Sequence, residues 1–220
     1  DTYKKHGNSR LEEGVSCLTC HRITEATSQG NASYSIELTN RKKYPFEDDE
    51  STTGEYLGHK FINAKPNIHK ESYMKPLYKD SKYCASCHDE TSPITNKQIV
   101  STFKEWEASP YNNKEDKTKN KSCIDCHMTY LQDDKFEPLK GVSTNGGVVK
   151  NDVKVHYFAG SNHFLAGLKD KKNEEQILQL LRTSAKLDVN IKDNQLLVGV
   201  QNVGAGHHLP TGVSDFRELW

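Results

Sequence analysis

Three short segments with one pattern constrain this chain more than any other feature of its sequence. In each, two cysteines are separated by two residues and a histidine follows at once, and together the segments use all six cysteines. With ten histidines in 220 residues, chance would place a histidine behind all three pairs in roughly one of ten thousand unrelated sequences. The segments are Cys17-Leu18-Thr19-Cys20-His21, Cys84-Ala85-Ser86-Cys87-His88 and Cys123-Ile124-Asp125-Cys126-His127.

This pattern is the attachment motif of c-type haem. Its two thiols can form thioethers with the two vinyl groups of one porphyrin, and its histidine then places a ring nitrogen under the iron. Five consecutive residues therefore supply both the attachment and the proximal ligand. We predict three covalently attached haem c groups, held by Cys17, Cys20, Cys84, Cys87, Cys123 and Cys126, with His21, His88 and His127 as proximal iron ligands.

Other uses of paired cysteines fit the pattern less well. A zinc site needs two pairs that converge on one metal, and three pairs leave one without a partner. An iron–sulfur cluster usually takes four cysteines at another spacing and has no role for the histidine. A disulfide that closes a two-residue loop would be strained. Since haem attachment uses every thiol, no cysteine remains for a disulfide or a catalytic nucleophile.

Charge and hydropathy narrow the class of protein further. Thirty lysines and arginines balance thirty aspartates and glutamates, which leaves no basic field for nucleic acid or an anionic membrane surface. The mean hydropathy is -0.83 and no run of about 18 apolar residues occurs, so we expect no transmembrane segment. The first residues have no signal peptide. Because bacteria attach haem c outside the cytoplasmic membrane, we expect an exported protein, periplasmic or extracellular, whose signal peptide is absent from this chain.

The small share of hydrophobic residues bears on the fold. Only 34% of the residues are hydrophobic, which is little core material for this length, and haems are large apolar bodies that can supply the missing volume. We therefore predict a mostly α fold with long loops wrapped around a haem cluster, largely unfolded without haem, and a small C-terminal β segment that forms part of a sandwich. The predicted domains are a trihaem cytochrome domain over 1–168, a connecting helix over 169–185 and an incomplete β-domain over 186–220.

Apolar periodicity predicts a few elements in detail. An apolar stripe predicts a helix over 173–185, and alternating apolar residues on both sides of Asp193-Asn194 predict a β-hairpin. The end of the chain, 216–220, is expected to be another strand. Before these elements we expect a long loop over 22–66 and a short helix over 68–74. A three-turn helix should carry Ile99, Phe103 and Trp106 behind a cap at Thr95 or Asn96. An exposed loop is expected over 112–121.

Several segments resemble the multihaem c-type cytochromes. The resemblance covers the three motifs, 14–22, 69–89 and 105–128, and the segment that begins at His156. The segment 206–212, with 217–220, looks like the opening of an immunoglobulin-like β-domain that follows the haem domain in some members. The resemblance implies electron transfer, although relatives with an open iron site reduce nitrite or oxidise hydroxylamine.

The sixth ligand of each iron separates these functions. Seven histidines remain besides the proximal three, and three haems with two histidines each need only three of them. We favour those that lie near a haem motif and match the pattern of the family. The favoured distal ligands are His69, His156 and His6, and the reserve candidates are His163, His59 and His207.

Our leading hypothesis is a carrier or conduit of electrons with bis-histidine haems, which has no substrate chemistry of its own and exchanges electrons with redox partner proteins such as other cytochromes. Two alternatives stay open. One is a multihaem oxidoreductase in which one open haem acts on a small nitrogen or sulfur compound; against it, all three motifs end in histidine, whereas some relatives use lysine at the catalytic haem. The other is a subunit of a conductive extracellular cytochrome filament. We also expect the C-terminal β-segment to need a cover, either from further chain or by self-association, because its apolar face and strand edges lack partners.

Overall fold

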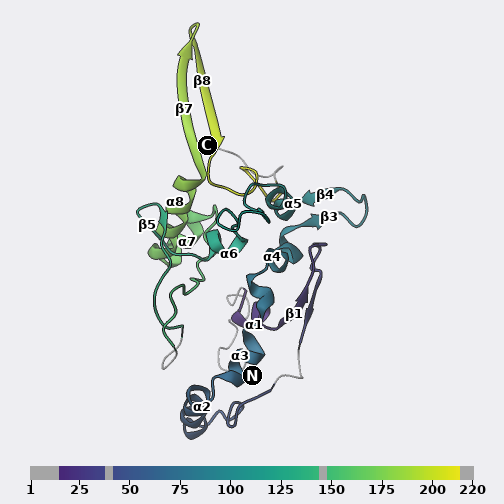
Figure 1. Ribbon diagram of the computed structural model, residues 1–220, viewed down its shortest axis with the longest axis vertical. Coiled ribbons are helices and arrows are strands. Elements are labelled where there is room, and N and C mark those ends of the chain that lie inside the picture. The colour runs from purple at the N-terminus through teal and green to yellow at the C-terminus, as the bar shows by residue number, and fades with distance from the viewer. Residues whose placement is uncertain (1–14, 38–41, 144–147, 214–220) are drawn as a thin grey trace.

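The structure, a computed structural model, describes residues 15–37, 42–143 and 148–213. The histidine at position 6 and the strand expected at 216–220 lie outside these ranges, so both remain predictions. Short elements joined by long connections make up the described chain (Figure 1). The helices are α1 (Cys17–His21), α2 (Thr52–Ala64), α3 (Asn67–Tyr73), a 3-10 turn at Pro76–Lys79, α4 (Ser81–His88), α5 (Thr102–Glu107), α6 (Cys123–His127), α7 (His163–Lys169) and α8 (Lys171–Ser184).

The strands of the described residues pair only in twos, always antiparallel. The first three pairs have strands of two to four residues, whereas the last pair has two strands of eight residues. The strands are β1 (Ile23–Ala26), β2 (Tyr34–Ile36), β3 (Glu90–Thr91), β4 (Gln98–Val100), β5 (Leu131–Gln132), β6 (Lys135–Phe136), β7 (Ala185–Lys192) and β8 (Gln195–Asn202).

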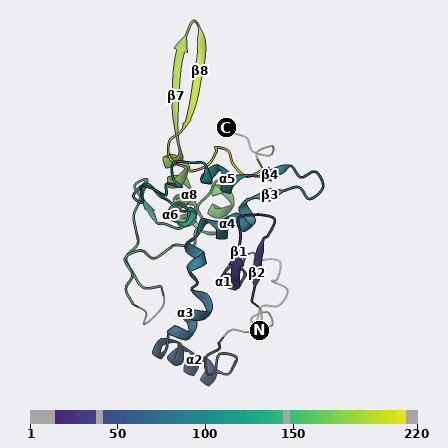
Figure 2. The ribbon, with the colours of Figure 1, turned by 45° about the vertical axis from the view of Figure 1, so that its right-hand side comes forward.

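The β7–β8 hairpin confirms the prediction made from alternation. Its register runs from Ala185 opposite Asn202 to Lys192 opposite Gln195. Asp193 and Asn194 form the turn with φ values of 50° and 60°, as a two-residue turn with a twist matched to its strands requires. The hairpin projects from one end of the molecule, and α2 lies at the opposite end (Figures 1 and 2).

Helix α8 occupies the segment where the apolar stripe predicted a helix. The Asp170 side chain caps it by accepting a hydrogen bond from the Lys172 amide at 2.9 Å. The buried Gln176 side chain accepts from the Leu131 amide at 2.7 Å and donates to the Leu131 carbonyl at 2.8 Å, so the helix pairs with β5 much as a strand would. The hydrophobic core of this region consists of Leu131, Ala159, Ile177 and Leu180, with Ala166 packed against it.

The prediction of a long loop over 22–66 is wrong, because the segment contains the β1–β2 hairpin and α2. Ser51 caps α2 by accepting a hydrogen bond from the Gly54 amide at 3.0 Å. The residues that α2 buries are Gly54 and Gly58, and the former lies against the Asp49 side chain. Two glycines within a helix of 13 residues lower its helix propensity, which favours a loop when the sequence is considered alone.

The predicted three-turn helix around Phe103 and Trp106 is shorter than expected. Helix α5 begins at Thr102, whereas Ile99 lies in β4, which pairs with β3. Asn96 has a φ of 56° in the β3–β4 connection and does not cap a helix. The pairing of β3 with β4 therefore overrides the helical spacing of the apolar residues.

The chain buries little apolar material against itself. Its accessible surface is 16439 Å², whereas a compact monomer of 24.9 kDa would expose about 10,000 Å². Within the described ranges the buried hydrophobic residues are only Ile23, Tyr44, Ala85, Val100, Phe103, Leu131, Ala159, Ile177 and Leu180.

Candidate haem-attachment sites

Each cysteine-histidine motif lies on a short helix: the first forms α1, the second ends α4 and the third forms α6. Cysteines three residues apart lie on the same side of a helix, and all six thiols are free. Ser122 starts α6 with a capping box, in which its side chain accepts from the Asp125 amide and its own amide donates to the Asp125 carboxylate at 2.9 Å. The motif geometry is therefore set locally, as the sequence predicts.

The three motifs lie next to one another. The Cys123 thiol and burial raise the pKa of Cys84, and the Cys20 thiol contributes to this shift. In turn, the neighbouring Cys84 thiol lowers the pKa of Cys123 to about 7, while burial raises the pKa of Cys126 to about 11. The Cys123 amide donates to the Ser81 hydroxyl at 3.3 Å, which ties α6 to α4. The attachment points on α1, α4 and α6 thus form one cluster in the middle of the molecule.

Backbone carbonyls orient two of the proximal histidines. Nδ1 of His21 donates to the Tyr73 carbonyl at 2.8 Å, and Nδ1 of His127 donates to the Ala159 carbonyl at 2.5 Å. A bond of this kind fixes the ring and leaves Nε2 for a metal. The ring of His88 is exposed, and within the described ranges no such carbonyl holds it.

Two proximal histidines each face a second imidazole. The ring centroids of His21 and His156 are 6.3 Å apart, with an interplanar angle of 35°. Those of His127 and His207 are 6.1 Å apart and nearly parallel, at 9°. Two imidazoles on opposite sides of one metal have centroids about 6.2 Å apart, given a metal–nitrogen bond of about 2.0 Å and about 1.1 Å from nitrogen to ring centre. Both pairs therefore have the spacing that a shared iron requires.

In each pair, the surroundings of one imidazole disfavour its charged form, and the neutral form is the one that binds a metal. Burial lowers the pKa of His127, and the neighbouring His207 lowers it further. Burial and the neighbouring His21 lower the pKa of His156. Lys154, two residues before His156, donates to Asp125 at 3.2 Å, so this segment is tied to α6.

The other candidate histidines have different surroundings. The His69 ring lies between Tyr44 and Tyr73, with centroid distances of 6.2 and 4.9 Å. His59 is exposed on α2, and Nδ1 of His163 is 3.9 Å from Glu174. Of the two favoured distal ligands that lie in the described ranges, His69 and His156, the structure brings His156 to a proximal histidine, and it adds the reserve candidate His207. The prediction that His69 and His6 are distal ligands stays a prediction.

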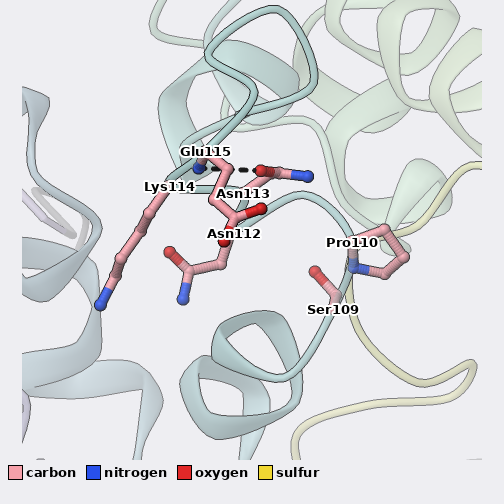
Figure 3. A pocket seen from close by; sticks show the side chains of 6 residues that line it. All are labelled: Ser109, Pro110, Asn112, Asn113, Lys114 and Glu115. Atoms are coloured by element: carbon pink, nitrogen blue, oxygen red, sulfur yellow. Dashed lines mark hydrogen bonds between the residues drawn. The ribbon is translucent and has the colours of Figure 1, made fainter.

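An open hollow on the 109–115 connection has no features of a redox site (Figure 3). Its segment contains no helix or strand, which agrees with the predicted exposed loop over 112–121. The Asn113 side chain accepts a hydrogen bond from the Glu115 amide at 3.0 Å and so shapes the turn. The residues that line it are Ser109, Pro110, Asn112, Asn113, Lys114 and Glu115.

The residues present fit haem better than a bare metal ion. Within the described part of the chain, no three His, Cys, Asp or Glu side chains are grouped to hold a metal ion, so the zinc alternative gains no support there. By contrast, each motif supplies two free thiols and a histidine, and two of these histidines face a second imidazole. In addition, Nε of Arg22, directly behind the first motif, is buried without a hydrogen-bond partner; a haem propionate is an anion that fits it.

Three such motifs define the class of this protein as a c-type cytochrome. Residues 83–148, which include the second and third motifs, match the family of cytochrome c554 and c-prime. No curated protein and no solved structure matches the chain. The protein is thus a c-type cytochrome that carries covalently bound haem c and transfers electrons, and cytochromes of this class are typically exported. None of the described helices is long and apolar enough to cross a bilayer.

Proposed function

We propose that this cytochrome is a trihaem carrier or conduit of electrons, exported to the periplasm or the cell exterior, with the haem cluster wrapped by the chain. The facing pairs His21–His156 and His127–His207 carry the proposal. Each pair would hold one haem iron between its two imidazoles. His88 would hold the third iron, for which His69 and His6 remain the candidate distal ligands. Haem with two imidazole ligands supplies one-electron chemistry toward the lower part of the potential range that axial ligands set.

The contact between motifs supports passage of electrons between haems. Tyr83 and Cys84 adjoin Cys20, and Cys84 adjoins Cys123, so the three attachment points are in series. The excess of accessible surface supports a haem cluster as the missing core. These observations favour a chain whose residues bind, orient and enclose the haems, while the partners are other redox proteins.

Ligand replacement combined with spectroscopy tests the proposal. The mass of the protein should exceed that of the bare chain by three haems. Electron paramagnetic resonance of the oxidised protein should show low-spin iron, and His156→Ala and His207→Ala should each convert one haem to a high-spin, ligand-accessible form. His59→Ala and His163→Ala are matched controls and should leave the spectrum unchanged, while His69→Ala tests the ligand of the third iron. Fewer than three haems, or an unchanged spectrum in His207→Ala, would contradict the proposal.

The oxidoreductase alternative depends on His88. Its ring is exposed and faces no imidazole among the described residues. If this haem is open in the native protein, cyanide or nitrite should bind to the oxidised wild type at one haem. Such binding would favour an enzyme that acts on a small nitrogen or sulfur compound over a pure carrier.

The projecting β7–β8 hairpin supports self-association as a further part of the proposal. One face of the hairpin is aliphatic and exposed over three successive residue pairs, and the opposite face is mainly polar. A second copy of this face is the occupant we propose, and repeated contacts of this kind are what the filament alternative requires. The expected immunoglobulin-like domain remains a prediction, and the hairpin would be the first part of that domain. The aliphatic face consists of Leu187, Val189, Ile191, Leu196, Val198 and Val200, which are 53% to 73% exposed.

A further inference from the structure

The loop that carries His207 is held from several sides. At its start, the Asn202 side chain accepts from the Ala205 amide at 3.0 Å and donates to the His207 carbonyl at 2.7 Å. At Gly206 the loop lies so close to α5 and the segment after it that a Cβ would be 3.1 Å from the Tyr111 ring and 3.2 Å from the Trp106 ring. The position of His207 thus depends on how the loop docks on α5.

The Glu105 carboxylate is the centre of this docking. It belongs to α5, and its side chain is only 10% exposed. Oε2 accepts from the Thr211 hydroxyl at 2.7 Å and from the His208 amide at 3.0 Å. Oε1 accepts from the Ser101 hydroxyl at 2.5 Å and lies 3.4 Å from Nδ1 of His208. One carboxylate therefore binds the loop on both sides of residues 209 and 210 and is itself held by its own helix.

The electrostatics agree with an ionised carboxylate at this position. Burial by itself raises the pKa of Glu105, but hydrogen bonds from Ser101, Thr211 and the His208 amide lower it below the usual value. Hydrogen bonds to a charged acceptor are about twice as strong as neutral ones. A second contact, between the Thr102 and Thr211 hydroxyls at 2.9 Å, ties the same loop to the first turn of α5.

We propose that Glu105 is a positioning residue that holds His207 opposite His127. The inference rests on the proposed role of His207 as an iron ligand and adds the group that sets its place. Glu105 acts through the amide next to His207 and through Thr211, and it does not contact the ring that faces His127. Without it, the loop keeps the Asn202 and Thr102 hydrogen bonds and the close approach of Gly206 to α5, but it loses the carboxylate that binds it next to His207, so the imidazole should leave its place for part of the time.

Spectroscopy of the complete, haem-loaded protein tests this role. In Glu105→Ala, the ratio of detached to ligated His207 should rise about tenfold or more, which corresponds to loss of one charge-assisted hydrogen bond. The readouts are the high-spin signal and the reduction potential of a single haem. Glu105→Gln should recover part of the low-spin signal, because its amide oxygen still accepts a hydrogen bond. Glu107→Ala, an exposed glutamate of the same helix, is the matched control and should resemble the wild type.

The outcomes distinguish the assignment of His207 as a ligand from the positioning role of Glu105. If His207→Ala converts one haem and Glu105→Ala converts none, the ligand assignment holds and the role of Glu105 is overturned. If His207→Ala converts no haem, both are overturned. In the double variant, Glu105→Ala should add nothing to His207→Ala. The unchanged low-spin signals of the other haems report that a variant is folded. If Glu105→Ala fails to fold, Thr211→Val takes its place and must affect the same haem to a smaller extent. A wild-type spectrum for Thr211→Val would then overturn the proposal.

Discussion

At the scale of single residues, main-chain carbonyls and one glycine do much of the positioning around the motifs. The carbonyls of Tyr73 and Ala159 orient His21 and His127, so the backbone at 73 and 159, and not a polar side chain, holds these two rings. Gly30 is different. It has a φ of 71°, and a Cβ there would collide with the Asp89 carbonyl, directly behind the second motif.

Gly30 should therefore be intolerant of alanine. Both the left-handed backbone and the collision oppose a side chain, so we expect Gly30→Ala to lower the free energy of unfolding of the haem-loaded protein by about 1–3 kcal/mol. Gly141→Ala is the control, because a Cβ at Gly141 meets nothing within 4 Å, and it should change stability by less than about 0.5 kcal/mol. Denaturant titration followed by circular dichroism measures both. Equal effects of the two substitutions would contradict the role of Gly30.

At the scale of elements, the β7–β8 hairpin projects from the molecule with little of its surface packed against the rest of the described chain. A two-stranded ribbon is marginally stable alone, and here six aliphatic side chains share one exposed face. These side chains are 53% to 73% exposed, so two copies packed face to face would remove much of this apolar surface from water. The ribbon therefore offers a contiguous apolar surface for an interface.

The self-association proposed for this ribbon predicts a concentration-dependent mass. In sedimentation, the wild type should be dimeric or larger, and Val189→Thr with Val198→Thr should shift it toward the monomer. Threonine keeps a high strand propensity, so the change removes apolar contact and spares the hairpin. Asn190→Thr with Leu197→Thr alters the neighbouring pair on the opposite face and should leave the mass unchanged. A wild type that stays monomeric, with a hairpin well protected from hydrogen exchange, would be inconsistent with the proposed interface.

At the scale of the whole molecule, the protein surface exceeds that of a compact chain of the same mass by about 6,000 Å². The hydrophobic core described above joins α8 to β5 and the segment at Ala159. It does not include the motif helices α1 and α6, which bury no residue. The haems are the bodies that can fill the space around these helices.

The haem-free chain should consequently lack a stable fold. We expect a variant with all six cysteines replaced by alanine to show little helix by circular dichroism and no cooperative unfolding transition, because so small a core cannot offset the entropy of ordering the chain. The wild type with haem is the control. A cooperative transition in the haem-free variant would show that the chain has a core of its own.

Elements whose signals are local were predictable. The motif spacing, the stripe of α8 and the turn residues Asp193-Asn194 each determine a structure within a few residues of themselves. Helix α2 was missed because Gly54 and Gly58 lower its helix propensity, whereas in the fold both glycines are buried by close approach to other parts of the chain. Ile99 was misassigned because the pairing of β3 with β4 competes with its helical spacing.

The sequence by itself determined the chemistry: five consecutive residues, three times over, carry two thiols and an imidazole, and that combination specifies haem c wherever the chain places it. Only the tertiary structure decided which imidazoles meet. His156 faces His21 and His207 faces His127 across long stretches of chain, and sequence proximity had favoured His69 over His207. The physical reason is that each pair of neighbouring imidazoles is a contact between distant segments. Its geometry depends on the Tyr73 and Ala159 carbonyls and on the docking of a loop on Glu105, none of which leaves a periodic signal in the sequence.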